Sequence, residues 1–200
     1  MQNKNMIKNF DWEKHLQEWS LKRLEILEDY EKEELPASML ESGYLGYPGA
    51  TEQEIATAEA RLGLTFPYSY REFLKVSNGL LTSGQGLKFS STEEIEWYAW
   101  DNEAFIDKCI ETWEPVTDEE YFVYGAEQWD LVWRPEYLQT AIEISSRDNG
   151  YIFLLNPQVS VLDNEWEAWF CSFSTAWGIS RYRSFQEMME NILNDPESIF

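Results

Sequence analysis

The sequence predicts an α+β fold, with helices flanking a mainly antiparallel sheet in a single domain. Three observations support this prediction: a pair of capped helices within residues 51–79, later segments rich in β-branched and aromatic residues, and a final helix with one apolar face. With 44% hydrophobic residues among 200, the chain can bury a sizeable core without disulfides or metals. We therefore expect one globular unit.

An acidic helix is expected from Asp11 to about Glu34. Its apolar residues recur at helical spacing and approximate one face: Trp12, Leu16, Trp19, Leu24 and Leu27. A Leu-Pro step ends this helix, and a Gly-rich loop follows. We therefore divide the chain into residues 1–45, an N-terminal acidic helix packed on the domain, and residues 46–200, the domain itself.

Two further helices are expected between residues 51 and 79. Thr51 and Glu54 form a capping box at the start of the first helix, and Gly63 ends it in the left-handed conformation. Pro67 opens the second helix, which an Asn-Gly pair closes. Apolar residues of both helices have the spacing of a buried face: Ile55, Ala58, Leu62, Tyr70, Phe73 and Leu74. We expect this face to pack on the sheet rather than bind a ligand.

The strands are expected after this pair of helices. A turn at residues 83–86 leads to a short strand at 87–89, and Ser91 with Glu94 caps a further helix that includes residues 95–97. Four segments rich in β-branched and aromatic residues are expected as strands: 121–124, 140–144, 151–155 and 167–173.

The last expected element is a helix capped by Ser184 and Glu187. Its apolar residues form a continuous stripe: Phe185, Met188, Met189, Ile192 and Leu193. An Asp-Pro pair at positions 195–196 ends it. The stripe predicts that this helix flanks the sheet.

Two blocks of motif residues identify a family. The first block runs Leu-Gly, then Pro-x-Ser-Tyr-x-x-Phe-Leu, then Asn-Gly, and its residues are Leu62, Gly63, Pro67, Ser69, Tyr70, Phe73, Leu74, Asn78 and Gly79. The second block comprises Asp148, Gly150, Tyr151 through Pro157, Glu165-Trp166-Glu167-Ala168, Arg181-Tyr182 and Ser184-Phe185. Together these blocks resemble the SUKH superfamily, of Smi/Knr-type regulators of fungal cell-wall synthesis and immunity proteins of bacterial toxin systems. The likeness covers roughly residues 46–193, with Phe66 where leucine is usual. It implies a Smi/Knr-like domain and a role in binding rather than catalysis.

Charge is the strongest functional indication that does not depend on the family. The chain has 37 acidic and 15 basic residues and a formal net charge of −22. Such a molecule repels nucleic acid and anionic lipid, so neither is expected as a partner. The acidic residues cluster in several runs, each of which is either a solvated face or a contact site for a basic protein.

Catalytic and metal-binding patterns are missing from the sequence. The single histidine, His15, is remote in sequence from Cys109 and Cys171, so no Cys-His or Ser-His arrangement or zinc set is indicated. Both cysteines are expected to be reduced and buried. The Asp-Asn-Gly run at 148–150 fits a tight turn better than a calcium loop. We expect no cofactor, no metal and no enzymatic activity. Without an apolar secretory or membrane segment, the protein is expected in the cytoplasm.

Tryptophans next to carboxylates leave a second class open. The pairs 97/100, 129/133 and 166/169 could stack on sugars, with Glu165 or Glu167 as hydrolytic carboxylates. This pattern would suit a carbohydrate-binding module or glycosidase. The opposing interpretation is that the strand tryptophans at 166 and 169 build the core, while those near 97, 100 and 113 serve a protein interface.

The hypothesis favoured by the sequence is an immunity-type protein that covers the active site of a cognate toxin, with a basic nuclease as the favoured toxin. A regulatory scaffold is the alternative within the same family. The expected partner surface combines the central acidic runs with nearby tryptophans: Glu93, Glu94, Glu96, Trp97, Trp100, Glu111, Trp113, Glu114, Asp118, Glu119 and Glu120. The sequence specifies neither the toxin nor the oligomeric state.

Overall fold

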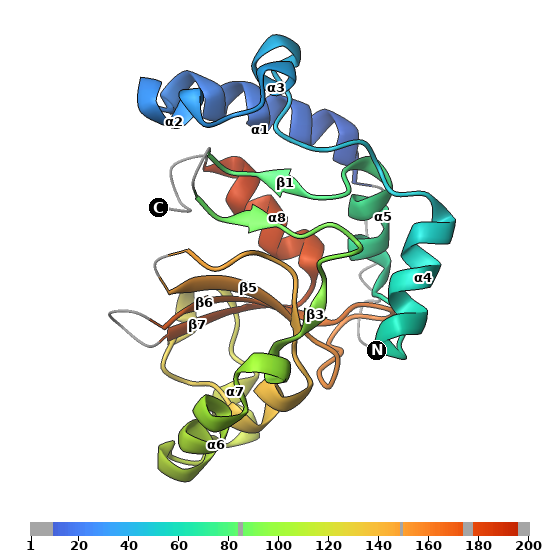
Figure 1. The fold of residues 1–200 in the computed structure, drawn as a ribbon. Coiled ribbons are helices and arrows are strands. Elements are labelled where there is room, and N and C mark those ends of the chain that lie inside the picture. Colours follow the sequence, from blue (N-terminus) through green and yellow to red (C-terminus); the bar gives the residue numbers. More distant parts are fainter. Residues whose placement is uncertain (1–9, 84–85, 149, 174–177, 196–200) are drawn as a thin grey trace, which may run out of the picture.

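A computed structural model describes residues 10–83, 86–148, 150–173 and 178–195 (Figure 1). An antiparallel sheet lies between two groups of helices, which confirms the predicted α+β fold. The α-helices are α1 (Trp12–Ile26), α2 (Asp29–Glu33), α3 (Ala37–Ser42), α4 (Glu52–Leu62), α5 (Tyr68–Val76), α6 (Glu103–Thr112), α7 (Asp118–Tyr121) and α8 (Phe185–Asn194). The 3-10 helices are η1 (Tyr98–Asp101), η2 (Gly125–Glu127) and η3 (Pro135–Thr140).

The main sheet has five strands in sequential order, and each pairs antiparallel with the next. They are β3 (Glu96–Trp97), β4 (Ile142–Glu143), β5 (Tyr151–Asn156), β6 (Glu167–Ser172) and β7 (Gly178–Tyr182). A smaller sheet pairs β1 (Leu80–Leu81) with β2 (Lys88–Phe89), and a bridge from Phe89 to Ser145 joins it to the main sheet. The strands predicted at 151–155 and 167–173 are thus confirmed. The turn predicted at 83–86 falls partly outside the described residues.

Both faces of the main sheet are buried. Along β5, Phe153 and Leu155 point into one core, whereas Ile152 and Leu154 point into the other. The first core is closed by α1, α4, α5 and α8, and the second by η1, α6 and η3. A strand covered on both faces carries a nearly continuous apolar run, which is what the sequence of β5 shows.

The predicted pair α4–α5 is confirmed in detail. The Thr51 hydroxyl accepts from the N–H of Glu54 at 3.3 Å, and the Glu54 carboxylate accepts from the N–H of Thr51 at 2.7 Å. Gly63 ends α4 with a φ of +72°. Phe73 of α5 has no exposed surface and contacts the rings of Trp12, Tyr70, Phe89 and Phe185. The helix predicted from Ser184 is also confirmed as α8.

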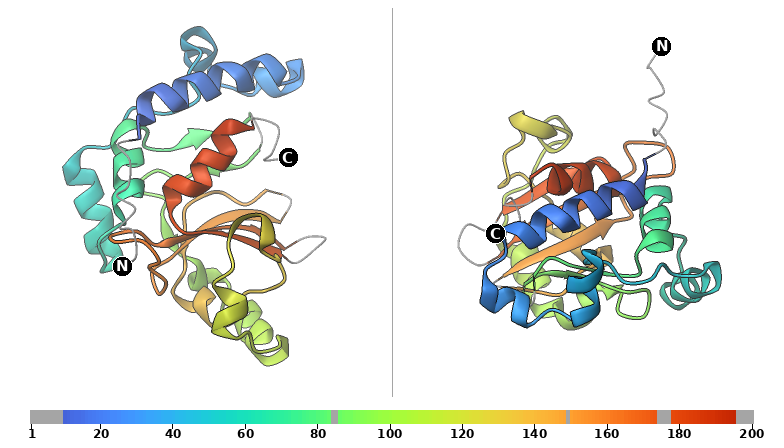
Figure 2. Two further views of the ribbon diagram at one scale, coloured as in Figure 1. Left: turned by 180° about the vertical axis from the view of Figure 1, so that it is seen from behind. Right: turned by 90° about the horizontal axis from the view of Figure 1, so that it is seen from above.

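The prediction of one long helix from Asp11 to Glu34 is wrong. Helix α1 ends at Ile26, Leu27 is extended and buried, and α2 begins after Glu28. The break arises because Glu28 and Glu31 form a capping box of their own, which starts a new helix in a new direction. Seen from above in Figure 2, α1 runs beside α8, against which it packs. The division of the chain at residue 45 stays a prediction.

The helix predicted after Ser91 is also wrong. The expected cap is present, since the N–H of Ser91 donates to Glu94 at 2.9 Å, but only a turn follows before β3. The guanidinium of Arg61 donates to the carbonyl oxygens of Thr92 (3.2 Å) and Ile95 (2.7 Å). A helix would need those carbonyls for its next turn, so this contact from α4 favours the strand.

Residues 121–124 do not form the predicted strand. Thr117 and Glu120 form a capping box that starts α7, and the phenol of Tyr121 then turns toward the sheet. The strand predicted at 140–144 is shorter than expected, because η3 occupies its beginning and only β4 remains. In both segments, side chains are buried from helical turns rather than from a pleated strand: Tyr121 from the end of α7, and Leu138 from η3.

Candidate functional site

The two motif blocks meet at Glu165, a carboxylate with no exposed surface. The N–H of Ser69 donates to its Oε1 at 2.8 Å, and the Ser69 hydroxyl donates to its Oε2 at 2.6 Å. Because Ser69 lies in the first turn of α5, the carboxylate satisfies a helix N-terminus. The same hydroxyl accepts from the N–H of Gln186 in α8. Burial raises the pKa of Glu165, an effect that the bonds from Ser69 oppose.

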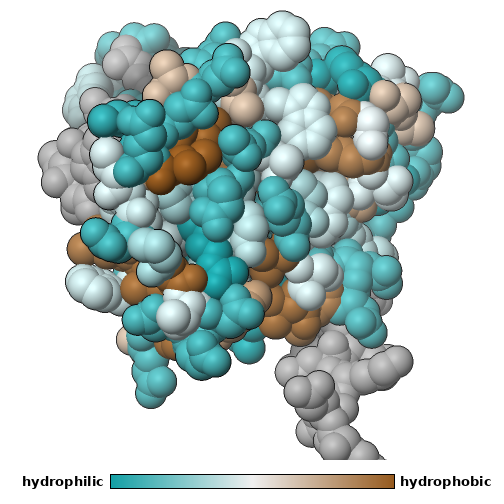
Figure 3. Space-filling view, turned by 90° about the horizontal axis from the view of Figure 1, so that it is seen from below, coloured by the Kyte–Doolittle hydropathy of each residue, from teal (hydrophilic) through white to brown (hydrophobic). Residues whose placement is uncertain are grey.

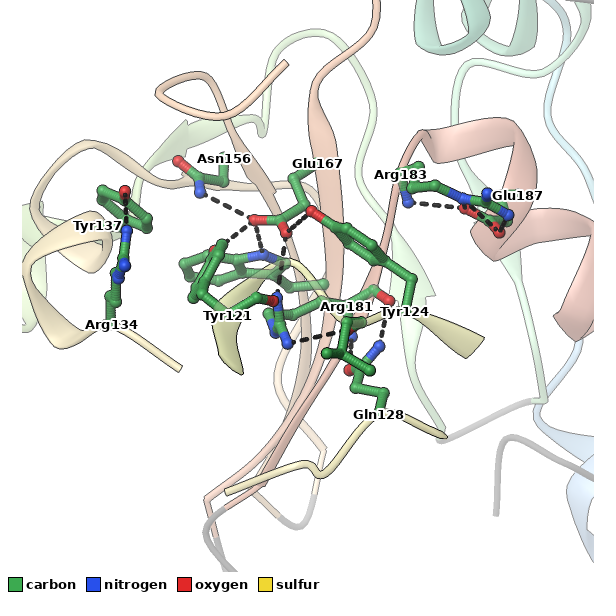
Figure 4. A network of polar contacts seen from close by, with 12 residues as sticks. Tyr121, Tyr124, Gln128, Arg134, Tyr137, Asn156, Glu167, Arg181, Arg183 and Glu187 are labelled. Atoms are coloured by element: carbon green, nitrogen blue, oxygen red, sulfur yellow. Dashed lines mark hydrogen bonds and ion pairs between the residues drawn. The ribbon is translucent and has the colours of Figure 1, made fainter. Parts of the chain in front are cut away.

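A second buried carboxylate, Glu167, is the centre of the polar network in Figure 4. Four side chains donate to it: the phenols of Tyr121 (2.5 Å) and Tyr124 (2.7 Å), the indole of Trp169 (2.8 Å) and the amide of Asn156 (3.1 Å). Its Oε1 also lies 3.5 Å from Nη1 of the fully buried Arg181. A buried charge with this many donors is compensated in place.

Arg181 of β7 connects the end of α7 and the segment after it to the sheet through hydrogen bonds and ring contacts. Its guanidinium lies 4.2 Å from the ring centroid of Tyr121 and 5.4 Å from that of Tyr124. It also donates to the carbonyl oxygens of Tyr121 and Val123. Burial, with the negative charge of Glu167, raises the pKa of both tyrosines, so they remain neutral hydrogen-bond donors.

The carboxylates considered for glycoside hydrolysis therefore have structural roles. Glu165 and Glu167 are buried, and hydrogen bonds to the chain occupy their oxygens. The tryptophans of this block do not form a sugar platform either, because Trp166 packs on the first core and Trp169 is buried in the second. The predicted core role of these two tryptophans is confirmed.

The predicted partner residues near β3 are largely at the surface. Glu93 and Glu94 are exposed in the turn before β3, and Glu96 is half-buried on the strand. The carboxylate of Glu94 pairs with Lys88 at 2.5 Å, and that of Glu96 pairs with Arg61 at 2.9 Å. Partial burial opposes ionisation of Glu94, but the bonds from Lys88 and Ser91 outweigh it and lower its pKa.

The predicted residues near α6 and α7 are also exposed. Glu111 pairs with Lys108 at 3.3 Å, and Asp118 pairs with Arg134 at 2.5 Å. Within the described ranges, four of the predicted acids take part in no ion pair: Glu93, Glu114, Glu119 and Glu120. The backbone and hydroxyl of Thr117 lower the pKa of Glu120. All four carboxylates are exposed, so they are open to a cation of a partner.

The tryptophans divide into core and surface. Trp113 is half-buried, with its ring 4.3 Å from that of the buried Trp133, so it contributes mainly to the second core. Trp97 is half-buried on β3, whereas Trp100 on η1 is 78% exposed. Trp129, at the opposite edge of the sheet, is 66% exposed. Among the predicted tryptophans, Trp100 therefore presents the largest free surface.

Trp97 and Trp100 line a surface hollow of about 490 Å³, which we call the Trp97–Trp100 hollow. Its remaining lining residues are Ala99, Glu103, Ile106, Asp107 and Gln139. Figure 3 shows the end of the molecule that carries α6, where hydrophobic patches lie among hydrophilic side chains. The sequence prediction missed Glu103 and Asp107. Their i, i+4 spacing three residues after Trp100 would have indicated a shared helical face.

The remaining sequence predictions concern reactive residues. Cys109 and Cys171 are free and buried, as predicted. His15 stacks on the ring of Phe10 at 4.4 Å. In the part of the chain that the structure describes, no three His, Cys, Asp or Glu residues are grouped so that they could hold a metal. Likewise, no helix in those ranges is long and apolar enough to cross a membrane.

The fold and the site define a small α+β domain whose motif carboxylates are structural and whose acidic residues are largely on the surface. The model of the SMI1 / KNR4 family (SUKH-1) matches residues 49–191, and the chain belongs to this family. Members of the family are generally immunity or regulatory proteins rather than enzymes. The comparison with curated proteins gave no match.

Proposed function

We propose that this chain is an immunity-type protein that binds a cognate toxin in the cytoplasm and neutralises it by covering the toxin's active site. Membership of the SUKH-1 family is consistent with a protein partner such as a toxin. The observation that carries the proposal is the exposed Trp100, which lines one hollow with Glu103 and Asp107, in a chain with a net charge of −22. An aromatic anchor among charges is the usual composition of a binding hot spot.

Charge complementarity favours a basic nuclease as the toxin. A nuclease site holds phosphates and is therefore positively charged, so an acidic surface can occupy it. Electrostatic steering would speed capture to as much as about 10⁸–10⁹ M⁻¹s⁻¹ at low salt. Opposite charges brought close at such an interface can couple by roughly 1.5–7 kcal/mol.

The proposed interface lies around β3, η1, α6 and α7. Of these elements, α6 and α7 are at the end of the molecule opposite α1, α2 and α3 (Figure 1). Ion pairs such as Glu96 with Arg61 do not block this use, because exposed pairs contribute little and can exchange partners. No turnover of glycans, nucleic acids or peptides is expected from the purified protein.

The proposal is tested with the products of the neighbouring genes. One of them should be toxic when expressed alone, harmless when co-expressed with this chain, and recovered with it in a pull-down. A neighbouring product that binds but has no toxicity would instead support the regulatory-scaffold alternative. If none of the neighbouring products binds, the immunity proposal is rejected.

Association and dissociation rates of surface variants test the proposed interface. Replacing Glu93, Glu114 and Glu119 by Gln removes three charges that form no ion pair with the described residues. This triple variant should slow association with the toxin and weaken the salt dependence of the association rate. Trp100→Ala should mainly raise the dissociation rate, because Trp100 is an anchor rather than a steering charge. The matched control replaces three exposed acids, on α1 and at the C-terminal end of α2, that form no ion pair within the described ranges: Glu25, Glu33 and Glu34. Equal slowing by both triple variants would contradict a localised interface.

A further inference from the structure

The Trp97–Trp100 hollow combines aromatic and acidic groups in one place. Its apolar lining comes from η1, β3 and α6, and its volume is within the roughly 300–1,000 Å³ of small-ligand sites. Glu103 and Asp107 are one helical turn apart on α6, so their carboxylates share a side of the helix. An occupant of this hollow would therefore meet flat aromatic surface and two negative charges.

Among the described residues, no basic side chain lines the hollow with these two carboxylates. Neither Glu103 nor Asp107 takes part in an ion pair within the described ranges. Two basic side chains lie in the neighbourhood: Lys108, which follows Asp107 on α6 and pairs with Glu111 at 3.3 Å, and Arg147, whose guanidinium lies 5.3 Å from the ring centroid of Tyr98 in η1. Arg147 is already paired with Glu143 at 2.8 Å, so its charge is compensated there.

Elsewhere in the chain, an aromatic ring together with a carboxylate binds an arginine side chain. The guanidinium of Arg134 lies 4.7 Å from the ring centroid of Tyr121 and pairs with Asp118 at 2.5 Å. Arg181 lies against the same ring and beside the carboxylate of Glu167. The hollow offers the aromatic face and the carboxylates of these arrangements without their cation.

We propose that the Trp97–Trp100 hollow is a receptor for an arginine side chain of the protein partner. The planar guanidinium can stack on the indole of Trp100 while its N–H groups face Glu103 and Asp107. Arginine suits the hollow better than lysine, because an ammonium is more strongly hydrated and cannot stack as a plane. Anionic ligands are disfavoured by the two carboxylates. This inference rests on the proposed function in one respect: the toxin is the partner that would supply the arginine.

The test needs no toxin. The protein, labelled with ¹⁵N, is titrated with N-acetyl-arginine-methylamide, and the indole N–H signals of Trp97, Trp100 and Trp129 are followed by NMR. Saturable shifts are expected at Trp97 and Trp100 but not at Trp129, which lies beside β7 at the other edge of the sheet. The neutral citrulline analogue should produce much smaller shifts, because it has the shape of arginine without its charge.

Variants assign the site. Glu103→Gln with Asp107→Asn should weaken the arginine affinity by about fivefold, the order expected when two partly exposed ion-pair contacts are lost. Glu33→Gln with Glu34→Gln removes the same charge at the far end and should leave the affinity unchanged. Trp100→Ala should abolish the Trp97 shifts, whereas Trp129→Ala should not.

Three results would overturn the proposal: equal shifts with citrulline, equal or tighter binding of the lysine analogue, or equal weakening by the two double variants. Each of these results would reject the arginine receptor. None of them would bear on toxin neutralisation, which is tested separately by co-expression. Conversely, a neutralisation test that fails would not change the NMR titration, so the two proposals fail separately.

Discussion

At the scale of single residues, the buried carboxylates explain why the two motif blocks occur together. Glu165 satisfies the N-terminus of α5 through Ser69, and Glu167 collects donors from α7 and from β5, β6 and β7. Both carboxylates therefore have partners far away in the sequence. Removing one partner leaves a buried polar group uncompensated, which is the costly outcome in a protein interior.

Phe73→Ala is expected to lower the free energy of unfolding by about 3–5 kcal/mol, because four aromatic rings surround a side chain without exposed surface. Chemical denaturation measures this loss. Tyr68→Ala is the control, since Tyr68 lies on the same helix and is 46% exposed. If Phe73→Ala loses no more stability than Tyr68→Ala, the prediction that Phe73 is a core residue is wrong.

Glu167→Gln is expected to lower the free energy of unfolding by about 3–5 kcal/mol, although it preserves shape. The amide leaves the buried Arg181 without its counter-charge and presents an N–H₂ to groups that donate. Tyr124→Phe removes only one hydrogen bond and should cost about 1–3 kcal/mol. If the two variants lose equal stability, the carboxylate charge is not what the network requires.

The raised pKa of Glu165 predicts a pH dependence. A carboxyl whose pKa is higher in the folded state binds its proton more tightly there, so it favours folding below its unfolded pKa of about 4.3. This contribution is lost as the pH rises through the folded pKa. The stability of the wild type relative to Glu165→Gln should therefore increase as the pH falls from 7 toward 4.5. A constant difference between their denaturation midpoints would contradict the prediction.

At the scale of elements, the segment after α7 protects the last strand of the sheet. The Gln128 amide donates to the carbonyl of Arg181 at 2.7 Å, and its oxygen accepts from the N–H of Arg181 at 2.5 Å. The carbonyl of Asp130 accepts from the N–H of Ile179 at 2.8 Å. An irregular segment thus satisfies the edge of β7, which would otherwise be a site for pairing with another chain.

Gln128→Ala should accelerate hydrogen exchange at the backbone N–H of Arg181, because the side chain is the acceptor of that bond. The N–H of Ile179 serves as the internal control, since its acceptor is the backbone of Asp130. Exchange at Arg181 should increase more than at Ile179 when both are measured by NMR. Unchanged exchange at Arg181 would show that Gln128 does not protect the edge.

At the scale of the whole molecule, a net charge of −22 on a chain of 200 residues sets the background for every local interaction. Twelve ion pairs are formed within the described ranges, and most of their members are partly exposed. Exposed pairs each contribute little, so self-repulsion of the excess acids should dominate the long-range electrostatics.

The melting temperature is therefore expected to rise when NaCl is increased from 10 to about 200 mM, because salt shortens the Debye length to below about 10 Å and screens the repulsion. Differential scanning calorimetry measures this shift. Sodium chloride is the suitable salt, since sulfate also stabilises proteins by exclusion from their surface. A falling melting temperature would mean that the ion pairs outweigh the repulsion.

The sequence by itself determined the elements whose signals are local. The Thr51 and Ser184 caps, the end of α4 at Gly63 and the apolar run of β5 depend on neighbours within one turn or one strand, so they were predicted correctly. The same holds for the two motif blocks, which indicated the family before the fold was known.

Only the tertiary structure decided what distant contacts control. Hydrogen bonds from Arg61 of α4 favour β3 over the helix expected after Ser91. Hydrogen bonds from Tyr121 and Tyr124 to Glu167 stabilise residues 121–124 as turns rather than as a strand. The Trp97–Trp100 hollow likewise needs β3, η1 and α6 to come together. These outcomes depend on hydrogen bonds and packing between residues tens of positions apart, whose energies exceed the local propensities that a sequence pattern reports.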